Sequence, residues 1–335
     1  MTEQCSAGCA ANGGIPGLTY RSANWLNAWN GTHTWRASAS YVTGAHSMKV
    51  GYIGGFLQDF RKNFTNNQNL VFRVNNGIPN QITETALPFE TKSDVRYDAF
   101  YAQNQWTRGR MTLQGALRFD FARSYFPEQT IGPSNYLSFQ TTFPKTDGVT
   151  GYKNLTPRGG LAYDVFGNGK TSVKINIGQY LEPASNGNGV YSSANPTSRI
   201  ATTVTRTWTD NGNYTPDCDL TNGLAQDNRA SGGDFCAAIS DQNFGKPVFS
   251  NVIDSAIMGG WGIRPTDWQF GASVQQEVLP RVSIEAGYFR RWFQNFFVQE
   301  NRVLGTADYT QFTLNAPSDP RLPGAAATRF RTCTT

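Results

Sequence analysis

Two arginine–aspartate pairs are the first residues in this sequence whose types and spacing could do chemistry. Arg96 precedes Asp98 by two positions, and Arg118 precedes Asp120 by two positions. A cluster of such charged groups is one way to build a general acid–base centre. Residues two apart project from the same face of a β-strand, however, so each pair more simply forms a salt bridge on one side of a sheet. The spacing therefore favours a structural role.

Other reactive groups do not form a known catalytic or cofactor-binding pattern. The two histidines, His33 and His46, fall in one predicted hairpin, so we expect no Ser-His-Asp or Cys-His arrangement and no histidine metal site. The stretch GNGK at 167–170 lacks the spacing of a phosphate-binding loop, which favours a turn. The stretch PDCDLTN at 216–222 offers oxygen ligands for calcium but lacks EF-hand spacing. We predict no catalytic residue, no metal, no cofactor and no enzyme activity.

Five cysteines give a different kind of signal. Cys218 and Cys236 bracket a polar stretch rich in Gly, Asn and Asp, and we predict a disulfide between them, with two unpaired thiols as the alternative. Such a bridge requires an oxidising compartment or the cell exterior. Cys5 and Cys9 are either paired or free, and Cys333 has no assigned partner.

Alternation of apolar and polar residues is clearest in MTLQGALRFDFARSYF, residues 111–126. Every second residue from Met111 to Phe121 is apolar or small, and the residues between them include Arg118 and Asp120. This period of two predicts a β-strand with one apolar and one polar face. In a soluble sandwich the apolar face packs against a core, whereas in a membrane barrel it faces lipid and the polar face lines a lumen.

The same alternation recurs in five pairs of predicted strands, each joined by a turn that contains Gly, Asn or Pro. Several strands are longer than the ~9–11 residues that a tilted strand needs to cross a bilayer. Soluble sandwiches rarely need such length. The pairs are 32–42 with 47–60, 68–74 with 80–89, 93–106 with 111–126, 155–166 with 170–182, and 266–279 with 282–297.

Long connections separate the pairs, so short turns and long loops alternate along the chain. This arrangement is typical of outer-membrane barrels, which have short turns at one rim and long loops at the other. We predict an irregular N-terminal segment over 1–31 and a partial barrel over 32–335, with long loops at 127–154 and 183–264. Long loops on a rigid scaffold commonly carry recognition.

The composition fits the same class. Of the 335 residues, 16% are charged and 13% are aromatic, and the mean hydropathy is −0.46. No run of 18 apolar residues occurs, which excludes a transmembrane helix but leaves a membrane barrel open, because half of each barrel strand is polar. The net charge of +5 is spread along the chain, so we expect no nucleic-acid partner.

The alternation assigns individual side chains to the two faces of this predicted antiparallel meander. Alanine and glycine within the apolar rows favour lipid, which fills gaps, over a tightly packed core. We predict lipid-facing positions at Leu113, Leu117, Phe119, Phe121, Val274 and Ile284. We predict lumen-facing charges at Arg96, Asp98, Arg118, Asp120, Arg158, Asp164 and Lys174.

Three stretches resemble a known family. RYDAFYAQNQWTRGRMTLQGALRFD (96–120) resembles a hairpin found in many TonB-dependent receptors. LTPRGGLAYDVFGNGKTSVKINIGQYLE (155–182) and NNGIPNQIT (75–83) are more specific to the Oar-like group of these receptors. With the stretch at 267–291, the resemblance covers roughly residues 30–315.

The resemblance implies an all-β fold, part of a transmembrane β-barrel of the TonB-dependent receptor type with long extracellular loops. It implies the outer membrane of a Gram-negative bacterium, contact with its lipid bilayer, transport of an unknown ligand, and energy from a TonB complex. Family members have a signal peptide, a carboxypeptidase-regulatory-like domain, a TonB box and a plug before the barrel. This sequence has none of these and lacks a terminal aromatic strand, so we expect a fragment, with the TonB contact made through the missing N-terminal region.

Two further classes remain open from the sequence. One is a passive porin or adhesion barrel. The other is a soluble extracellular β-sheet protein that binds carbohydrate.

Overall fold

The computed structural model describes residues 1–187, 189–248, 251–315 and 329–334, without the side chains of 306, 310–315 and 329–334. The chain divides into two compact units, Met1–Asn295 and Phe296–Thr335. The second contains η5 (Thr306–Asp308) and an antiparallel pair of β19 (Thr310–Asn315) and β20 (Arg329–Thr334). The described helices are all too short and too polar to cross a membrane.

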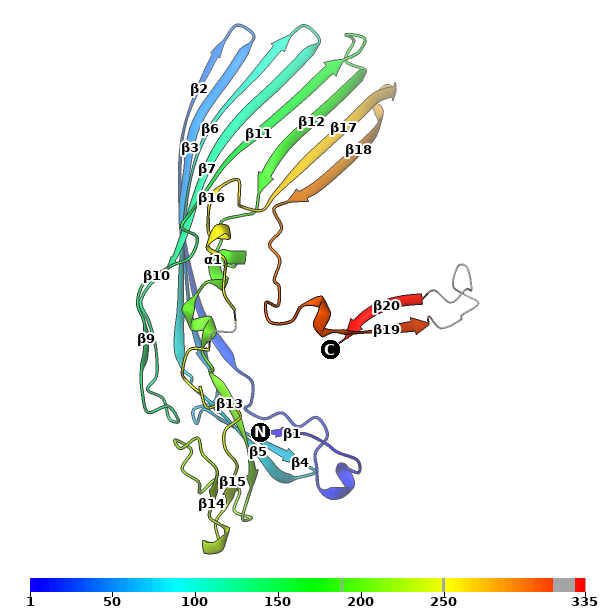
Figure 1. Cartoon of the computed structure of the whole chain (residues 1–335). Coiled ribbons are helices and arrows are strands. Elements are labelled where there is room, and N and C mark those ends of the chain that lie inside the picture. Colours follow the sequence, from blue (N-terminus) through cyan, green and yellow to red (C-terminus); the bar gives the residue numbers. More distant parts are fainter. Residues whose placement is uncertain (188, 249–250, 316–328, 335) are drawn as a thin grey trace. The chain divides into compact units, whose positions relative to one another are not determined.

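Eight long antiparallel strands form the wall of the first unit (Figure 1). Each pairs with its neighbour in the order β18-β17-β12-β11-β7-β6-β3-β2, and a short β10 (Thr146–Asp147) and β16 (Gly259–Trp261) pair with β7 and β11. This all-β antiparallel meander agrees with the fold class predicted from the sequence. The strands are β2 (Trp25–Thr43), β3 (His46–Phe64), β6 (Phe89–Arg108), β7 (Met111–Phe126), β11 (Gly151–Asp164), β12 (Thr171–Leu181), β17 (Thr266–Leu279) and β18 (Val282–Gln294).

Short turns join the wall strands at one end and long connections join them at the other. The four hairpins β2–β3, β6–β7, β11–β12 and β17–β18 turn at the top of Figure 1. Gly44 and Gly109 take positive φ angles in two of these turns, a conformation that glycine adopts without steric cost. The long connections 65–88, 127–150 and 182–265 leave from the opposite ends of the strands, which we call the loop rim.

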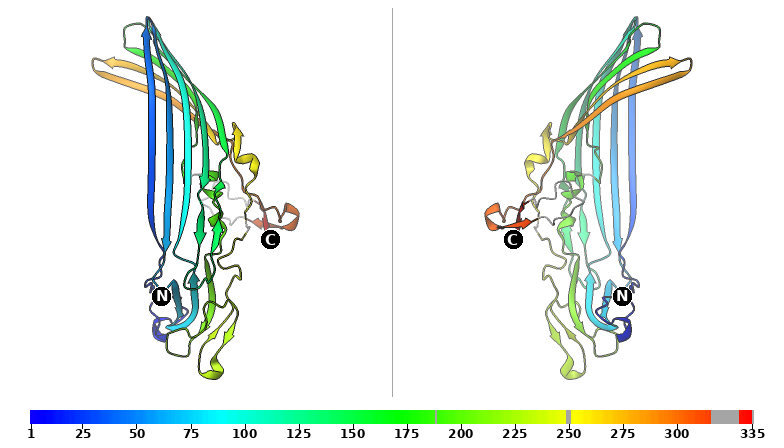
Figure 2. Two further views of the ribbon diagram at one scale, coloured as in Figure 1. Left: turned by 90° about the vertical axis from the view of Figure 1, so that its left-hand side faces the viewer. Right: turned by 90° about the vertical axis from the view of Figure 1, so that its right-hand side faces the viewer.

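A second sheet lies at the loop rim, as both views of Figure 2 show. Its short strands come from all parts of the chain before β16, so the rim is held by pairings distant in sequence. Their order is β1 (Thr2–Glu3), β4 (Leu70–Asn75), β5 (Ile78–Thr85), β13 (Thr203–Thr209), β15 (Phe235–Cys236) and β14 (Gln226–Asp227).

Smaller elements complete the loop rim. They are β8 (Gln129–Ile131) paired with β9 (Thr141–Phe143), α1 (Gly189–Ser193), η1 (Ala10–Asn12), η2 (Pro196–Arg199), η3 (Arg229–Ser231) and η4 (Ser255–Ile257).

Two sequence-based boundaries differ from the structure. The predicted hairpin 68–74 with 80–89 corresponds to β4 and β5, which belong to the rim sheet and not to the wall. Apolar and polar residues alternate in β4 and β5 as they do in the wall strands. The local sequence pattern therefore does not distinguish rim strands from wall strands. The strand β2 begins at Trp25, inside the segment 1–31 that was predicted to be irregular, because Trp25 and Trp29 continue the alternation of β2 toward the rim.

Close approach between strands β3 and β6 depends on glycine. Gly55 pairs with Tyr97 across the two strands, and a Cβ atom at Gly55 would overlap the ring of Tyr97. A Cβ atom added at Gly115 on β7 would meet no other atom within 4 Å. The two glycines therefore differ in what a methyl group would meet.

We expect Gly55→Ala to destabilise the chain by about 1–3 kcal/mol, because the Tyr97 ring must leave its position. Gly115→Ala, the matched control, gains about 0.5–1 kcal/mol because alanine loses less backbone entropy than glycine in a strand. Urea unfolding of both variants in detergent measures the difference. Equal midpoints would show that the packing of Tyr97 over Gly55 does not matter.

Candidate functional site

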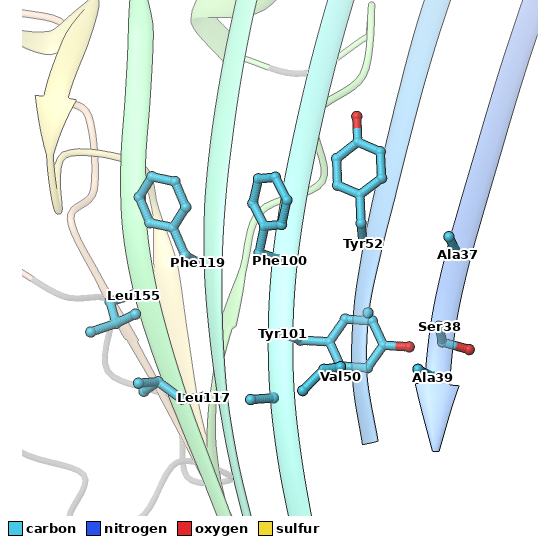
Figure 3. Close-up of a pocket in the computed structure, with 12 residues that line it drawn as sticks. Ala37, Ser38, Ala39, Val50, Tyr52, Phe100, Tyr101, Leu117, Phe119 and Leu155 are labelled. Atoms are coloured by element: carbon cyan, nitrogen blue, oxygen red, sulfur yellow. The ribbon is translucent and has the colours of Figure 1, made fainter. Parts of the chain in front are cut away.

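The strand register divides the wall into two faces. Phe119 of β7 pairs with Phe100 of β6 and with Leu155 of β11, and Phe100 pairs with Tyr52 of β3. Figure 3 shows Phe119, Phe100 and Tyr52 in one row, with Leu117 and Val50 in the next. We call the side that carries these residues the apolar face. By pairing and alternation it also carries all six predicted lipid-facing residues: Leu113, Leu117, Phe119, Phe121, Val274 and Ile284.

The apolar face is open to its surroundings. Leu117 and Val274 are each 46% exposed and Ile284 is 60% exposed. Among the described residues, no side chains pack over them as a core. Such a large exposed apolar surface on one side of a sheet is unusual in soluble monomers.

The opposite side, the polar face, carries five of the seven predicted lumen charges. Arg118 and Asp120 form an ion pair with 2.7 Å between Nη2 and Oδ1. Arg118 pairs across the strands with Thr156, which alternates with Arg158, and Lys174 pairs with Ala162, which alternates with Asp164. The five charges that share this face are Arg118, Asp120, Arg158, Asp164 and Lys174.

The assignment of Arg96 and Asp98 to the same face is wrong. Asp98 pairs with Phe121 and Arg96 pairs with Arg123, so both side chains project from the apolar face. Their ion pair is intact, at 3.2 Å, and the Tyr52 hydroxyl donates to Asp98. Both rows of β6 contain aromatic residues and alanines, so alternation within this strand alone does not reveal its polar face.

These residues lie between the exposed apolar rows and the loop rim. The Trp35 indole Nε1 donates to the Tyr52 hydroxyl at 3.2 Å, which links tryptophan, tyrosine and aspartate across three strands. Trp261 adds a ring 5.6 Å from that of Phe119. Amphipathic aromatic rings beside charges are typical of the boundary between hydrocarbon and water.

Loop residues cover the polar face near the loop rim. Val95, Ala99 and Ala122 on this face are fully buried. Tyr152 of β11 packs edge-on against Tyr191 of α1 with ring centroids 5.7 Å apart, and its hydroxyl donates to the backbone oxygen of Ile257 at 2.7 Å. The connection 182–265 therefore folds back against the wall.

A buried ion pair joins two strands of the rim sheet. Glu84 of β5 and Arg206 of β13 are 1% and 2% exposed, with 2.8 Å between Oε1 and Nε. Arg206 Nη2 also donates to the backbone oxygen of Asn222 at 2.8 Å. Desolvation raises the pKa of Glu84 to about 7, although the Arg206 charge opposes this shift. No local pattern in the sequence predicts this pair, because its two members are far apart in the chain.

Two disulfides lie in the loop-rim region. Cys218 is bonded to Cys236, the pairing predicted from the sequence, and both cysteines pack with Trp208, Leu70 and Ile82 in a small core. The Trp208 indole donates to Asp234 at 2.8 Å. Cys5 is bonded to Cys9, so of the two alternatives for this pair the structure has the bonded one.

The comparisons with known proteins agree with this architecture. A wall of long antiparallel strands with one apolar face, short turns at one end and long connections at the other defines the class of outer-membrane β-barrel proteins. The family model described as "Outer membrane beta barrel domain" matches residues 10–301. The chain therefore belongs to this family, and its location is the outer membrane. No curated protein and no solved structure shows a significant match.

Glu84 leads to a prediction about pH. Its folded pKa of about 7 lies above the ordinary 4.5, so the folded rim sheet binds this proton more tightly than the unfolded chain. The stability that protonation contributes is complete below pH 4.5 and is lost as the pH rises through 7. Hydrogen exchange of the β5 and β13 amides should therefore slow as the pH falls from 7 to 4.5, after correction for intrinsic rates.

The variant Glu84→Gln should remove this dependence, because glutamine is neutral at every pH. Its free energy of unfolding should match that of the parent chain near pH 4.5, where Glu84 is already protonated, and exceed it by up to about 3 kcal/mol above pH 7. Asp227→Asn, on an exposed ion pair with Arg229, is the control and should leave the dependence intact. A pH dependence that persists in Glu84→Gln would assign it to another group.

Proposed function

We propose that this chain forms barrel wall and ligand-facing loops of an Oar-like TonB-dependent receptor. Membership of the outer-membrane barrel family supports the barrel, and the stretches at 96–120 and 155–182 support the receptor group. The two stretches coincide with the central hairpins β6–β7 and β11–β12 of the wall.

The apolar face is proposed to contact the lipid bilayer, and the polar face to line the lumen. The exposed Leu117, Val274 and Ile284 support the first assignment, because a barrel wall must present apolar side chains to hydrocarbon. The Arg118–Asp120 ion pair supports the second, since paired charges are stable beside water.

The folded loop rim is the observation that carries the receptor proposal. Connections of a passive channel need only join strands, whereas here they form a second sheet, buried clusters and a disulfide. Outer-membrane barrels place their long loops outside the cell. An ordered external surface suits recognition of a specific ligand, whose import then requires energy from a TonB complex.

Ligand import should depend on TonB. We expect a strain that expresses the complete gene product to lose uptake of the ligand when its tonB gene is deleted, with surface binding unchanged. The in-frame sequence upstream of this chain should encode a plug and a TonB box. Uptake that persists without TonB, or an open conductance of the purified protein in planar bilayers, would favour the passive porin.

The proposed lipid contact has a direct test in two neighbouring residues of β7. Leu117→Arg places a charge on the apolar face and should destabilise folding into lipid vesicles by about 2–4 kcal/mol. Ala116→Arg places the same charge on the polar face and should cost much less. Urea titration of both variants in vesicles measures the contrast, and equal costs would contradict the assignment of the faces.

A further inference from the structure

A polar cavity of about 440 Å³ lies between the wall and the connection 182–265. Asp59 and Arg61 of β3 and Ser93 of β6 line one side, and Asn186 and Asn195 line the other. Asp59 pairs with Ser93 across the strands. The volume of the cavity is within the range of small-molecule sites, which is about 300–1,000 Å³.

Hydrogen bonds hold both sides of this cavity in place. The Ser93 hydroxyl and the Asn186 amide group lie 2.8 Å apart, which joins the wall to the loop. Asn195 is buried, and its amide donates to the backbone oxygen of Lys92 at 3.1 Å and accepts from Gln129 at 3.0 Å. The site is thus built before any ligand arrives, which lowers the entropy cost of binding.

The Asp59 side chain lines this cavity and has one carboxylate oxygen without a hydrogen-bond partner. Its residue is 7% exposed, and Oδ2 bonds to Arg61 Nε at 2.7 Å. Among the described residues, no donor reaches Oδ1, which is itself buried. A buried carboxylate oxygen without a partner is costly, so a donor is expected to complete it.

The cavity is nearly neutral in charge. Asp59 and Arg61 balance each other, and Lys92, which contributes to the lining, directs its amino group to the apolar face, over the Phe60 ring and 3.8 Å from Glu90. The other polar lining groups are hydroxyls and amides. Such groups both donate and accept, so they match a neutral ligand with many hydroxyl groups better than an ion.

We propose that this cavity binds a neutral mono- or disaccharide, with Asp59 accepting from a sugar hydroxyl. Phe89 and Ile200 supply an apolar patch in the lining for the C–H face of the ring. The inference names a ligand class for the proposed receptor and therefore rests on the proposed function. Binding to the cavity can be tested separately from transport, because binding alone does not need energy from a TonB complex.

Isothermal titration of the purified chain in detergent tests the proposal. The probes are glucose and maltose, with glucuronate and glucosamine as charged counterparts. We expect saturable binding of at least one neutral sugar and at least ~tenfold weaker binding of the charged ones. No binding of either neutral sugar, or tighter binding of a charged probe, overturns it.

Two variants place the binding at this cavity. Asp59→Asn should weaken sugar binding at least ~tenfold, since a hydrogen bond to a charged acceptor is lost. Asp227→Asn removes the carboxylate of another aspartate–arginine pair two residues apart, also at 2.7 Å, and should bind normally. Ser192→Trp should block the cavity and abolish binding. Normal binding by both Asp59→Asn and Ser192→Trp would overturn the assignment.

Thermal unfolding of each variant separates loss of binding from loss of folding. If Asp59→Asn is unfolded, the result of Ser192→Trp decides. Sugar binding that survives without TonB-dependent uptake would contradict the transport proposal and leave the cavity assignment standing. TonB-dependent uptake of another ligand, without sugar binding, would contradict the cavity assignment and leave the transport proposal standing.

Discussion

The hydrogen-bonded register between neighbouring wall strands is the constraint on which the rest of this structure depends. Because side chains alternate along a strand, a shift by one residue would exchange the two faces. Pairing Phe100 with Phe119 and Tyr101 with Arg118 places aromatic rings together on one side and the Arg118–Asp120 ion pair on the other. The same register sets Gly55 beneath Tyr97, so steric fit and polarity select one alignment.

The loop rim is stabilised by different interactions from those of the wall. The wall strands pair mostly with sequence neighbours, but the rim sheet joins β1, β4 and β5 to strands that lie after residue 200. Glu84 and Arg206 are buried there as a pair, because either charge alone would be expensive to desolvate. Apolar contacts around Trp208 and the Cys218–Cys236 bond add a small core. External loops can therefore keep a defined surface without the wall's regular pattern.

Sequence patterns predicted those parts of the fold in which neighbouring residues supply the signal. The strand 111–126 shows its two faces by alternation alone, and the four wall hairpins follow from their turns. Strand β6 does not, because Tyr97 and Tyr101 on one face match Phe100 on the other in character. Only pairing with β7 shows that Arg96 and Asp98 lie beside Phe121. The hairpin at 68–89 forms as its pattern predicts, but its place in the rim sheet depends on pairing with β13. That pairing and the Glu84–Arg206 pair are contacts distant in sequence, which periodicity does not contain.

Asn195 shows how side chains replace strand pairing where long connections meet the wall. Its amide bonds to the backbone of Lys92 in β6, to Gln129 in β8 and to the backbone nitrogen of Thr197 in η2. Buried backbone groups require partners, and irregular segments lack the ladder that supplies them in a sheet. One amide therefore ties two connections to one wall strand. Because the proposed sugar cavity is lined by this amide, ligand contacts there would act on the wall and on the loop at once.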